Sequence, residues 1–214
     1  MSTNRELPRT PLALAVLTLL LERPMHPYEM KGLMLERGHD RVIKLKGGSI
    51  YDTVERLQRL GFIQALETSR EGRRPERTVY SLTEAGRDEL MVWLRELLSK
   101  PVHEYPQFGA ALAFMVGLQD AKEVTELLRW RVIALESEIA ASEIVVKGSL
   151  ERKLPPIFII EERYAQAMRR AEADFVRRLI EDLESGGLWP DEETLQALIE
   201  EQKKRGGDGA LRET

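Results

Sequence analysis

The stretch Lys46-Gly-Gly-Ser-Ile-Tyr-Asp-Thr-Val-Glu-Arg-Leu-Gln-Arg-Leu-Gly61 decides the fold that we expect for the first half of this chain. Its glycines and serine indicate the start of a short helix, and Gly61 indicates the end of that helix. A strand over Phe62–Glu67, a basic turn and a second strand over Thr78–Leu82 follow. A helix followed by a basic β-hairpin is typical of a winged helix-turn-helix, in which the helix enters the DNA major groove and the hairpin reaches the flanking backbone.

Apolar residues recur at i, i+4 and i+7 from Ile50, so this face of the helix is expected to pack in a core. The predicted DNA contacts lie in the amino-terminal half of the helix: Ser49, Tyr51, Asp52 and Arg56. Two alternatives stay open at this point. Ser49 and Asp52 together fit a capping box, and Tyr51 fits a core position. As a DNA contact, Asp52 would accept a hydrogen bond from cytosine N4, although its charge repels phosphate.

Arginines are concentrated at the turn between the two strands: Arg70, Arg73, Arg74 and Arg77. A solvated hairpin would also tolerate such charges, but four arginines within eight positions favour contact with phosphate or with the minor groove. Lys44 and Lys46, just before the helix, are expected to contact the DNA backbone, with plain surface positions as the alternative.

Composition limits the class of protein. The chain has 214 residues, 43% of them hydrophobic, which suits one large or two small folded domains. No apolar run approaches the ~18 residues that a membrane span needs, and the absence of cysteine suits a reducing cytoplasm. Residues 1–100 carry 17 lysines and arginines against 14 acidic residues, whereas residues 101–214 carry 15 against 22. Positive charge therefore lies on the expected DNA-reading half.

The expected fold class is mainly α, with an N-terminal winged helix-turn-helix and long antiparallel C-terminal helices that form a dimerisation domain. We divide the chain into a flexible arm (1–9), a DNA-binding domain (10–100), a helical dimerisation domain (107–204) and a flexible tail (205–214). Prolines punctuate the boundary between the two domains.

The second half shows two long amphipathic patterns, over residues 120–147 and again from Ile157 to Leu183. Such a pair buries one stripe on each helix and leaves apolar surface, which a second copy of the protein would cover. The predicted dimerisation residues are Leu128, Leu135, Tyr164, Met168, Phe175 and Leu179. The alternative is an intramolecular bundle with the N-terminal helices.

These motifs together resemble the PadR family of winged-helix transcriptional regulators, in the subgroup with a long helical C-terminal domain. The resemblance covers residues 11–98 and is carried by His26-Pro-Tyr-Glu-Met30, Gly48-Ser-Ile-Tyr51, Leu57-Gln-Arg-Leu-Gly-Phe-Ile63, Gly72-Arg-Arg-Pro75 and Thr78-Val-Tyr-Ser-Leu-Thr-Glu-Ala-Gly86. Asp52 departs from the proline often found there, and Glu76 places an acid in a turn that is usually basic. The resemblance implies a homodimeric repressor of nearby promoters that a small molecule or a stress signal releases.

The sequence bears on two further kinds of site, an effector pocket and a metal site. Trp93, Tyr105, Phe108, Phe114 and Trp130 gather near the boundary between the halves, where a pocket for a flat apolar effector could form, with plain packing as the alternative. The three histidines are dispersed and show no metal-ligand spacing, so we expect neither a metal nor another cofactor.

The leading interpretation is therefore a cytoplasmic, sequence-specific regulator that binds a pseudo-palindromic double-stranded DNA operator as a homodimer and contacts no membrane. A winged-helix module that binds proteins instead of DNA is the alternative. The sequence contains no phosphate-binding glycine loop and no nucleophile beside a histidine, which argues against an enzyme.

Overall fold

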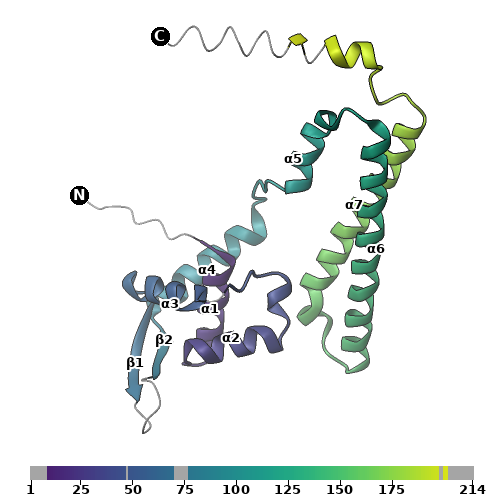
Figure 1. Cartoon of the computed structure of the whole chain (residues 1–214). Coiled ribbons are helices and arrows are strands. Elements are labelled where there is room, and N and C mark those ends of the chain that lie inside the picture. Colours follow the sequence, from purple (N-terminus) through teal and green to yellow (C-terminus); the bar gives the residue numbers. More distant parts are fainter. Residues whose placement is uncertain (1–8, 47, 70–76, 198–199, 202–214) are drawn as a thin grey trace, which may run out of the picture. The chain divides into compact units, whose positions relative to one another are not determined.

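The computed structural model describes residues 9–46, 48–69, 77–197 and 200–201. Within these ranges the chain is mostly helical and has one small sheet, as the sequence predicts (Figure 1). It divides into two compact units between His103 and Glu104, and each unit is described by itself.

The first unit is built around α1 (Pro11–Glu22). Thr10 begins this helix as its N-cap, because the Thr10 hydroxyl accepts a hydrogen bond from the Ala13 backbone N–H at 3.2 Å. Most residues of α1 are apolar, on nearly all sides of the helix, and seven of its twelve residues are buried. A helix that is apolar on nearly all sides is stable only in a core, so α1 is the central element of the first unit.

Helix α2 (Pro27–Glu36) and helix α3 (Ser49–Arg59) follow, with the short 3₁₀ helix η1 (His39–Arg41) between them. The Arg37 guanidinium binds the Glu22 carboxylate, with 2.8 Å between one pair of nitrogen and oxygen atoms, and so ties the end of α2 to the end of α1. This contact holds the pKa of Glu22 below its ordinary value. The charged form of Glu22 is therefore the one that the fold stabilises.

Strands β1 (Ile63–Ser69) and β2 (Arg77–Leu82) pair antiparallel, from Ile63 opposite Leu82 to Ser69 opposite Arg77, with a register shift between Ala65 and Glu67. A third segment joins this hairpin. Met25, between α1 and α2, exchanges two backbone hydrogen bonds of 3.1 Å with Tyr80. The sequence did not indicate this bridge, which attaches the hairpin to the start of α2.

Helix α4 (Glu84–Ser99) closes the first unit and adds the buried side chains of Leu90 and Trp93 to its core. Thr83 is the N-cap of α4, since its hydroxyl accepts a hydrogen bond from the Gly86 backbone N–H at 3.0 Å. The same hydroxyl donates to the Gly61 carbonyl at 2.7 Å. Thr83 therefore fixes the first turn of α4 to the end of α3.

The second unit contains α5 (Gln107–Phe114), η2 (Met115–Leu118), α6 (Ala121–Glu151), η3 (Pro156–Ile159) and α7 (Ile160–Glu184). Both long helices were expected, and α5 with η2 was not. Helices α6 and α7 pack antiparallel, because Arg129 near the start of α6 pairs with Glu184 at the end of α7, whereas Glu143 pairs with Arg170. A short helical segment at residues 192–197 follows.

Candidate nucleic-acid interface

Helix α3 begins at a glycine turn. Gly48 occupies the N-cap position in the left-handed region, at φ 82°, which favours glycine. Ser49 is the first residue inside the helix, and its hydroxyl donates a hydrogen bond to the Lys46 carbonyl at 2.7 Å. The capping-box alternative for Ser49 and Asp52 is therefore wrong, since no side chain caps α3.

One face of α3 packs in the core and the other lies in solvent. The expected core face is confirmed, since Ile50, Val54 and Leu57 are each 3% exposed or less. Tyr51 is 50% exposed, so the structure does not support a core role for it. Asp52 is also exposed. Of the four α3 side chains expected to read DNA, Tyr51 and Asp52 therefore lie on the free face of a helix whose other face is held by the core, while Ser49 and Arg56 are half-buried.

The ring of Tyr51 is placed by a neighbour from α2. Its centroid lies 6.4 Å from that of the His26 imidazole, with the rings edge to face at 71°. The His26 Nδ1 atom accepts a hydrogen bond of 3.0 Å from the Tyr28 backbone N–H and so caps α2. Two motifs that are 25 residues apart in the sequence thus meet at the surface, which spacing alone did not indicate.

The basic residues near α3 differ in exposure. Lys44 and Lys46 are exposed, whereas Arg56 is half-buried, and no atom of the described residues accepts a hydrogen bond from its Nε. Arg59 lies 3.9 Å from Glu55, one turn earlier on the same helix. Arg70, Arg73 and Arg74 lie outside the described residues. For Arg77 the structure describes only the backbone, at the start of β2.

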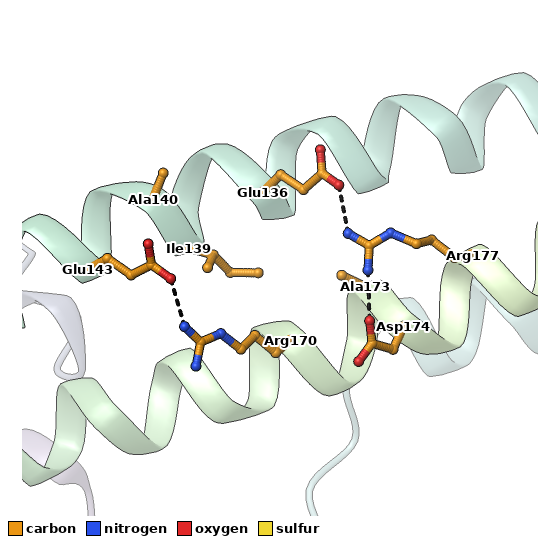
Figure 2. A pocket seen from close by; sticks show the side chains of 8 residues that line it. All are labelled: Glu136, Ile139, Ala140, Glu143, Arg170, Ala173, Asp174 and Arg177. Atoms are coloured by element: carbon orange, nitrogen blue, oxygen red, sulfur yellow. Dashed lines mark hydrogen bonds and ion pairs between the residues drawn. The ribbon is translucent and has the colours of Figure 1, made fainter.

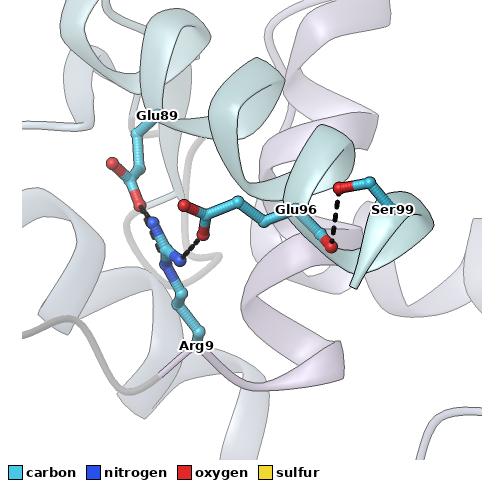
Figure 3. Close-up of polar contacts among 4 residues, drawn as sticks. All are labelled: Arg9, Glu89, Glu96 and Ser99. Carbon is cyan, nitrogen blue, oxygen red and sulfur yellow. Dashed lines mark hydrogen bonds and ion pairs between the residues drawn. The ribbon is translucent and has the colours of Figure 1, made fainter. Parts of the chain in front are cut away.

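The five residues predicted to form an effector pocket do not all line one cavity. Trp93 is 3% exposed in the core of the first unit. Figure 3 shows the Arg9 guanidinium between the carboxylates of Glu89 and Glu96 on α4, and its central carbon also lies 6.0 Å from the Trp93 ring centroid. The sequence places Arg9 in the expected flexible arm, whereas in the structure its ion pairs hold it on α4.

A cavity of about 350 Å³ lies inside the second unit, among α5, η2 and the first turns of α6. Its lining is mostly apolar and includes Phe108, Leu112, Phe114, Met115, Leu128 and Arg131. The Arg131 guanidinium lies 3.6 Å from the Phe108 ring centroid and also binds the Glu172 carboxylate of α7. Of the five predicted pocket residues, Phe108 and Phe114 line this cavity, whereas Tyr105 and Trp130 are 87% and 68% exposed.

The predicted dimerisation residues divide into two groups. Leu128, Leu135 and Leu179 are each 8% exposed or less inside the single chain, so their burial needs no second copy. Tyr164, Met168 and Phe175 lie exposed on α7. Three of the six predicted dimerisation residues are therefore exposed on the single chain.

No helix among the described residues is both long and apolar enough to cross a membrane. The described ranges also contain no group of three or more histidine, cysteine or acidic side chains arranged to hold a metal ion.

Solved structures with the same fold are winged-helix regulators. Bacillus subtilis PadR in complex with operator DNA superposes with a TM-score of 0.65 at 19% identity, over 82% of this chain and 99% of that one. The same protein in complex with p-coumaric acid gives a TM-score of 0.63 at 18% identity, over 81% and 98%. The Vibrio cholerae virulence activator AphA gives 0.61 at 16% identity, over 82% and 99%. A comparison with curated protein sequences gave no match.

The sequence itself matches a family model over residues 16–92, a range that contains α2, α3, the hairpin and most of α4. This range includes the glycine turn before α3 and the threonine cap of α4. Residues 16–92 thus form a domain of the transcriptional regulator PadR-like family, on a winged helix-turn-helix fold.

Proposed function

We propose that this protein is a homodimeric transcriptional repressor that binds a specific double-stranded DNA site and is released by a small apolar or aromatic ligand. The observation that carries the proposal is that one face of α3 is buried in the core while the opposite face is exposed. The core holds the helix through Ile50, Val54 and Leu57, while Tyr51 and Asp52 lie in solvent, and a β-hairpin follows the helix in the chain. A rigidly held helix with free side chains is what major-groove reading requires.

We assign a role in DNA binding to each predicted residue from its position. In this proposal base edges or nearby phosphates are contacted by the α3 side chains of Ser49, Tyr51, Asp52 and Arg56. Backbone contacts come from the basic residues on either side: Lys44, Lys46, Arg70, Arg73, Arg74 and Arg77. Phosphate contacts supply affinity for any sequence, and the α3 side chains supply discrimination between sequences.

The homodimer is proposed from the helical unit, in which both long helices keep exposed apolar side chains. A two-fold dimer presents two α3 helices to DNA, so the operator is expected to be pseudo-palindromic with half-sites about one or two helical turns apart. The similar fold seen in complex with operator DNA supports this reading.

Ligand control is proposed from the apolar cavity of about 350 Å³ in the second unit. A similar fold binds p-coumaric acid, an aromatic compound. A ligand that binds one arrangement of the dimer more tightly would shift the population away from the DNA-competent state. Titration of p-coumaric acid and other aromatic acids against wild-type protein and a Leu112→Trp variant, which fills the cavity, tests this part. Equal binding to both proteins would exclude the cavity as the ligand site.

Activation is a second candidate role, because the activator AphA has a similar fold. A reporter gene placed behind the bound promoter distinguishes the two roles. Repression predicts higher expression when the regulator is deleted, and activation predicts lower expression.

DNA binding is tested by selecting fragments of sheared genomic DNA on the purified protein and titrating the best fragment across a salt series. We expect one pseudo-palindromic site and a steep decrease of affinity with salt. The double variant Arg73→Ala plus Arg74→Ala should weaken binding to every sequence and reduce the salt slope by about 1–2, since each phosphate contact contributes roughly 0.9. Weak binding without sequence preference would favour the protein-interaction alternative.

A further inference from the structure

His26 lies where three elements of the first unit meet. The residue before it, Met25, exchanges two backbone hydrogen bonds of 3.1 Å with Tyr80 of β2. The residue after it, Pro27, is buried and begins α2. The imidazole ring of His26 contacts the ring of Tyr51 on α3. The segment around His26 therefore connects the hairpin, α2 and α3.

The backbone of His26 is held on both sides. A proline restricts the residue before it to extended conformations, and His26 has φ −83° and ψ 148°, inside that region. Pro27 itself has a fixed φ, which suits the first position of a helix. The bridge from Met25 to β2 restrains the chain immediately before His26. The Cα–Cβ bond of His26 consequently points in one fixed direction.

The side chain of His26 is held as well. Its Nδ1 atom accepts the hydrogen bond of 3.0 Å from the Tyr28 N–H and so caps α2. The pKa of the Glu29 carboxyl is held below its ordinary value by the Arg23 guanidinium and, more weakly, by the His26 backbone N–H. The reciprocal contacts of His26 and Glu29 form a capping box. The imidazole cannot turn without losing the hydrogen bond from Tyr28, so the start of α2 fixes the plane of the ring.

The fixed imidazole ring restrains Tyr51. The two ring centroids lie 6.4 Å apart at an interplanar angle of 71°, which is the edge-to-face geometry that aromatic pairs favour. The Tyr51 side chain is otherwise half exposed, and an exposed side chain samples several rotamers. Contact with His26 favours one of them. A side chain that is ordered before binding loses less conformational entropy when it binds, so its contact with DNA is stronger.

We propose that His26 is a positioning residue for DNA reading, which holds the Tyr51 ring in the orientation that discriminates between DNA sequences. The inference rests on the proposed function, in which Tyr51 contacts DNA, and extends it to a residue outside α3 and the hairpin. An aromatic pair of ordinary strength corresponds to a factor of roughly 2–10 in an equilibrium constant. Because phosphate contacts come from other side chains, this factor applies to the specific site and not to unrelated DNA.

The variant His26→Asn, made in the full chain, removes the ring and keeps the cap. Asparagine is among the best N-cap residues, so the Tm should stay close to that of wild type. Affinity for the best selected genomic site should decrease roughly 2- to 10-fold, whereas affinity for a shuffled duplex of equal composition should not change. An unchanged ratio of the two affinities would refute the proposal. An equal decrease for both duplexes would show that His26 itself contacts the phosphate backbone, which also refutes it.

The converse variant, His26→Phe, keeps an aromatic ring and removes the cap acceptor. Loss of the cap should lower the Tm by about 4–8 °C. At a temperature where both variants are folded, His26→Phe should keep more of the preference for the specific site than His26→Asn does. If both variants lose the same preference, the ring contact is not the cause and the inference is wrong.

His39→Asn is the matched control for the loss of an imidazole. It makes the same exchange in η1, at a histidine whose charge acts on Glu22 instead of contacting Tyr51. The preference for the specific site should stay at the wild-type value in this variant, because the Tyr51 ring keeps its neighbour.

A double-mutant cycle shows whether His26 and Tyr51 act together. If His26 acts through Tyr51, adding His26→Asn to Tyr51→Ala causes no further loss of affinity for the specific site. Additive losses would mean that His26 acts independently of Tyr51 and would refute the positioning role.

A measurement without DNA separates this inference from the proposed function. The ring signals of Tyr51 are recorded by NMR, with Tyr51→Phe to identify them among the five tyrosines. His26→Asn should shift these signals because the ring current of the imidazole is lost, and unchanged signals would refute the contact. Shifted signals in a protein whose wild type shows no sequence preference would reject the proposed function, and the reading role of His26 with it. A wild-type preference that His26→Asn leaves unchanged would reject only the inference.

Discussion

Gly86, in the first turn of α4, has no room for a side chain. A Cβ atom at this position would lie 2.0 Å from the Phe62 carbonyl oxygen, 2.8 Å from its carbonyl carbon and 2.9 Å from Leu82 Cδ1. The nearest atoms belong to the backbone, so no rotamer change relieves the contact. Gly86→Ala must therefore push α4 away from the start of the hairpin.

The expected cost combines three effects. Overpacking against backbone costs up to ~3 kcal/mol. Displacement of Phe62 also breaks the 3.0 Å hydrogen bond from the Thr83 N–H to the Phe62 carbonyl, which contributes ~1 kcal/mol. Alanine in place of glycine in a helix stabilises the folded state by ~0.5–1 kcal/mol, which offsets part of this cost. The net loss is about 3 kcal/mol, which corresponds to a decrease in Tm of roughly 15 °C for a unit of about 100 residues.

Scanning calorimetry of the full chain measures this effect on the transition of the first unit. Gly32→Ala is the matched control, because Gly32 lies exposed in α2 with nothing within 4 Å of the added Cβ. That change should stabilise the protein by ~0.5–1 kcal/mol through helix propensity alone. If Gly86→Ala has the same Tm as wild type, the packing described between α4 and the hairpin is wrong.

Three other changes test separate parts of the structure. Glu22→Gln should cost at most ~1 kcal/mol near neutral pH, because the ion pair with Arg37 is largely exposed to solvent. Since the pKa of Glu22 is lowered in the fold, the wild-type advantage should be complete above pH ~5 and decrease as pH falls through the folded pKa, which urea titrations at several pH values measure. Arg9→Gln should lower the Tm slightly at low salt and not at 1 M salt, because its ion pairs with α4 are screened. Tyr51→Ala should reduce operator affinity by ~1–3 kcal/mol, as the loss of a base contact does, with the Tm unchanged because the side chain is half exposed; a large decrease in Tm would instead indicate a packing role.

The sequence predicts the first unit well because its signals are local. The glycine turn before Ser49, the apolar spacing from Ile50 and the cap at Thr83 each act within about one helical turn. The Met25–Tyr80 bridge and the Arg9 ion pairs join residues that are 55 or more positions apart. Periodicity carries no information about such contacts.

For the helical unit, prediction from the sequence fails for a different reason. Periodicity identifies both long helices, but α6 is apolar on two sides, and the pattern does not say which side faces α7. The sequence therefore predicts that Leu128 and Leu135 contact a second copy, although α7 of the same chain lies against α6. The positions of Arg129, Glu136 and Glu143 show which side of α6 faces α7, because the ion-pair partners of these residues lie on α7, as Figure 2 shows for Glu136 and Glu143.

The most direct test of the central claim is the specificity ratio of the purified protein. Its affinity for the best selected genomic site is measured against a shuffled duplex of equal length and composition at one fixed salt concentration. A sequence-specific regulator is expected to prefer its site by a factor of roughly 10³ or more, and Tyr51→Ala should reduce that ratio more than it reduces binding to the shuffled duplex. Equal affinity for both duplexes would contradict the assignment of α3 as a reader of DNA sequence.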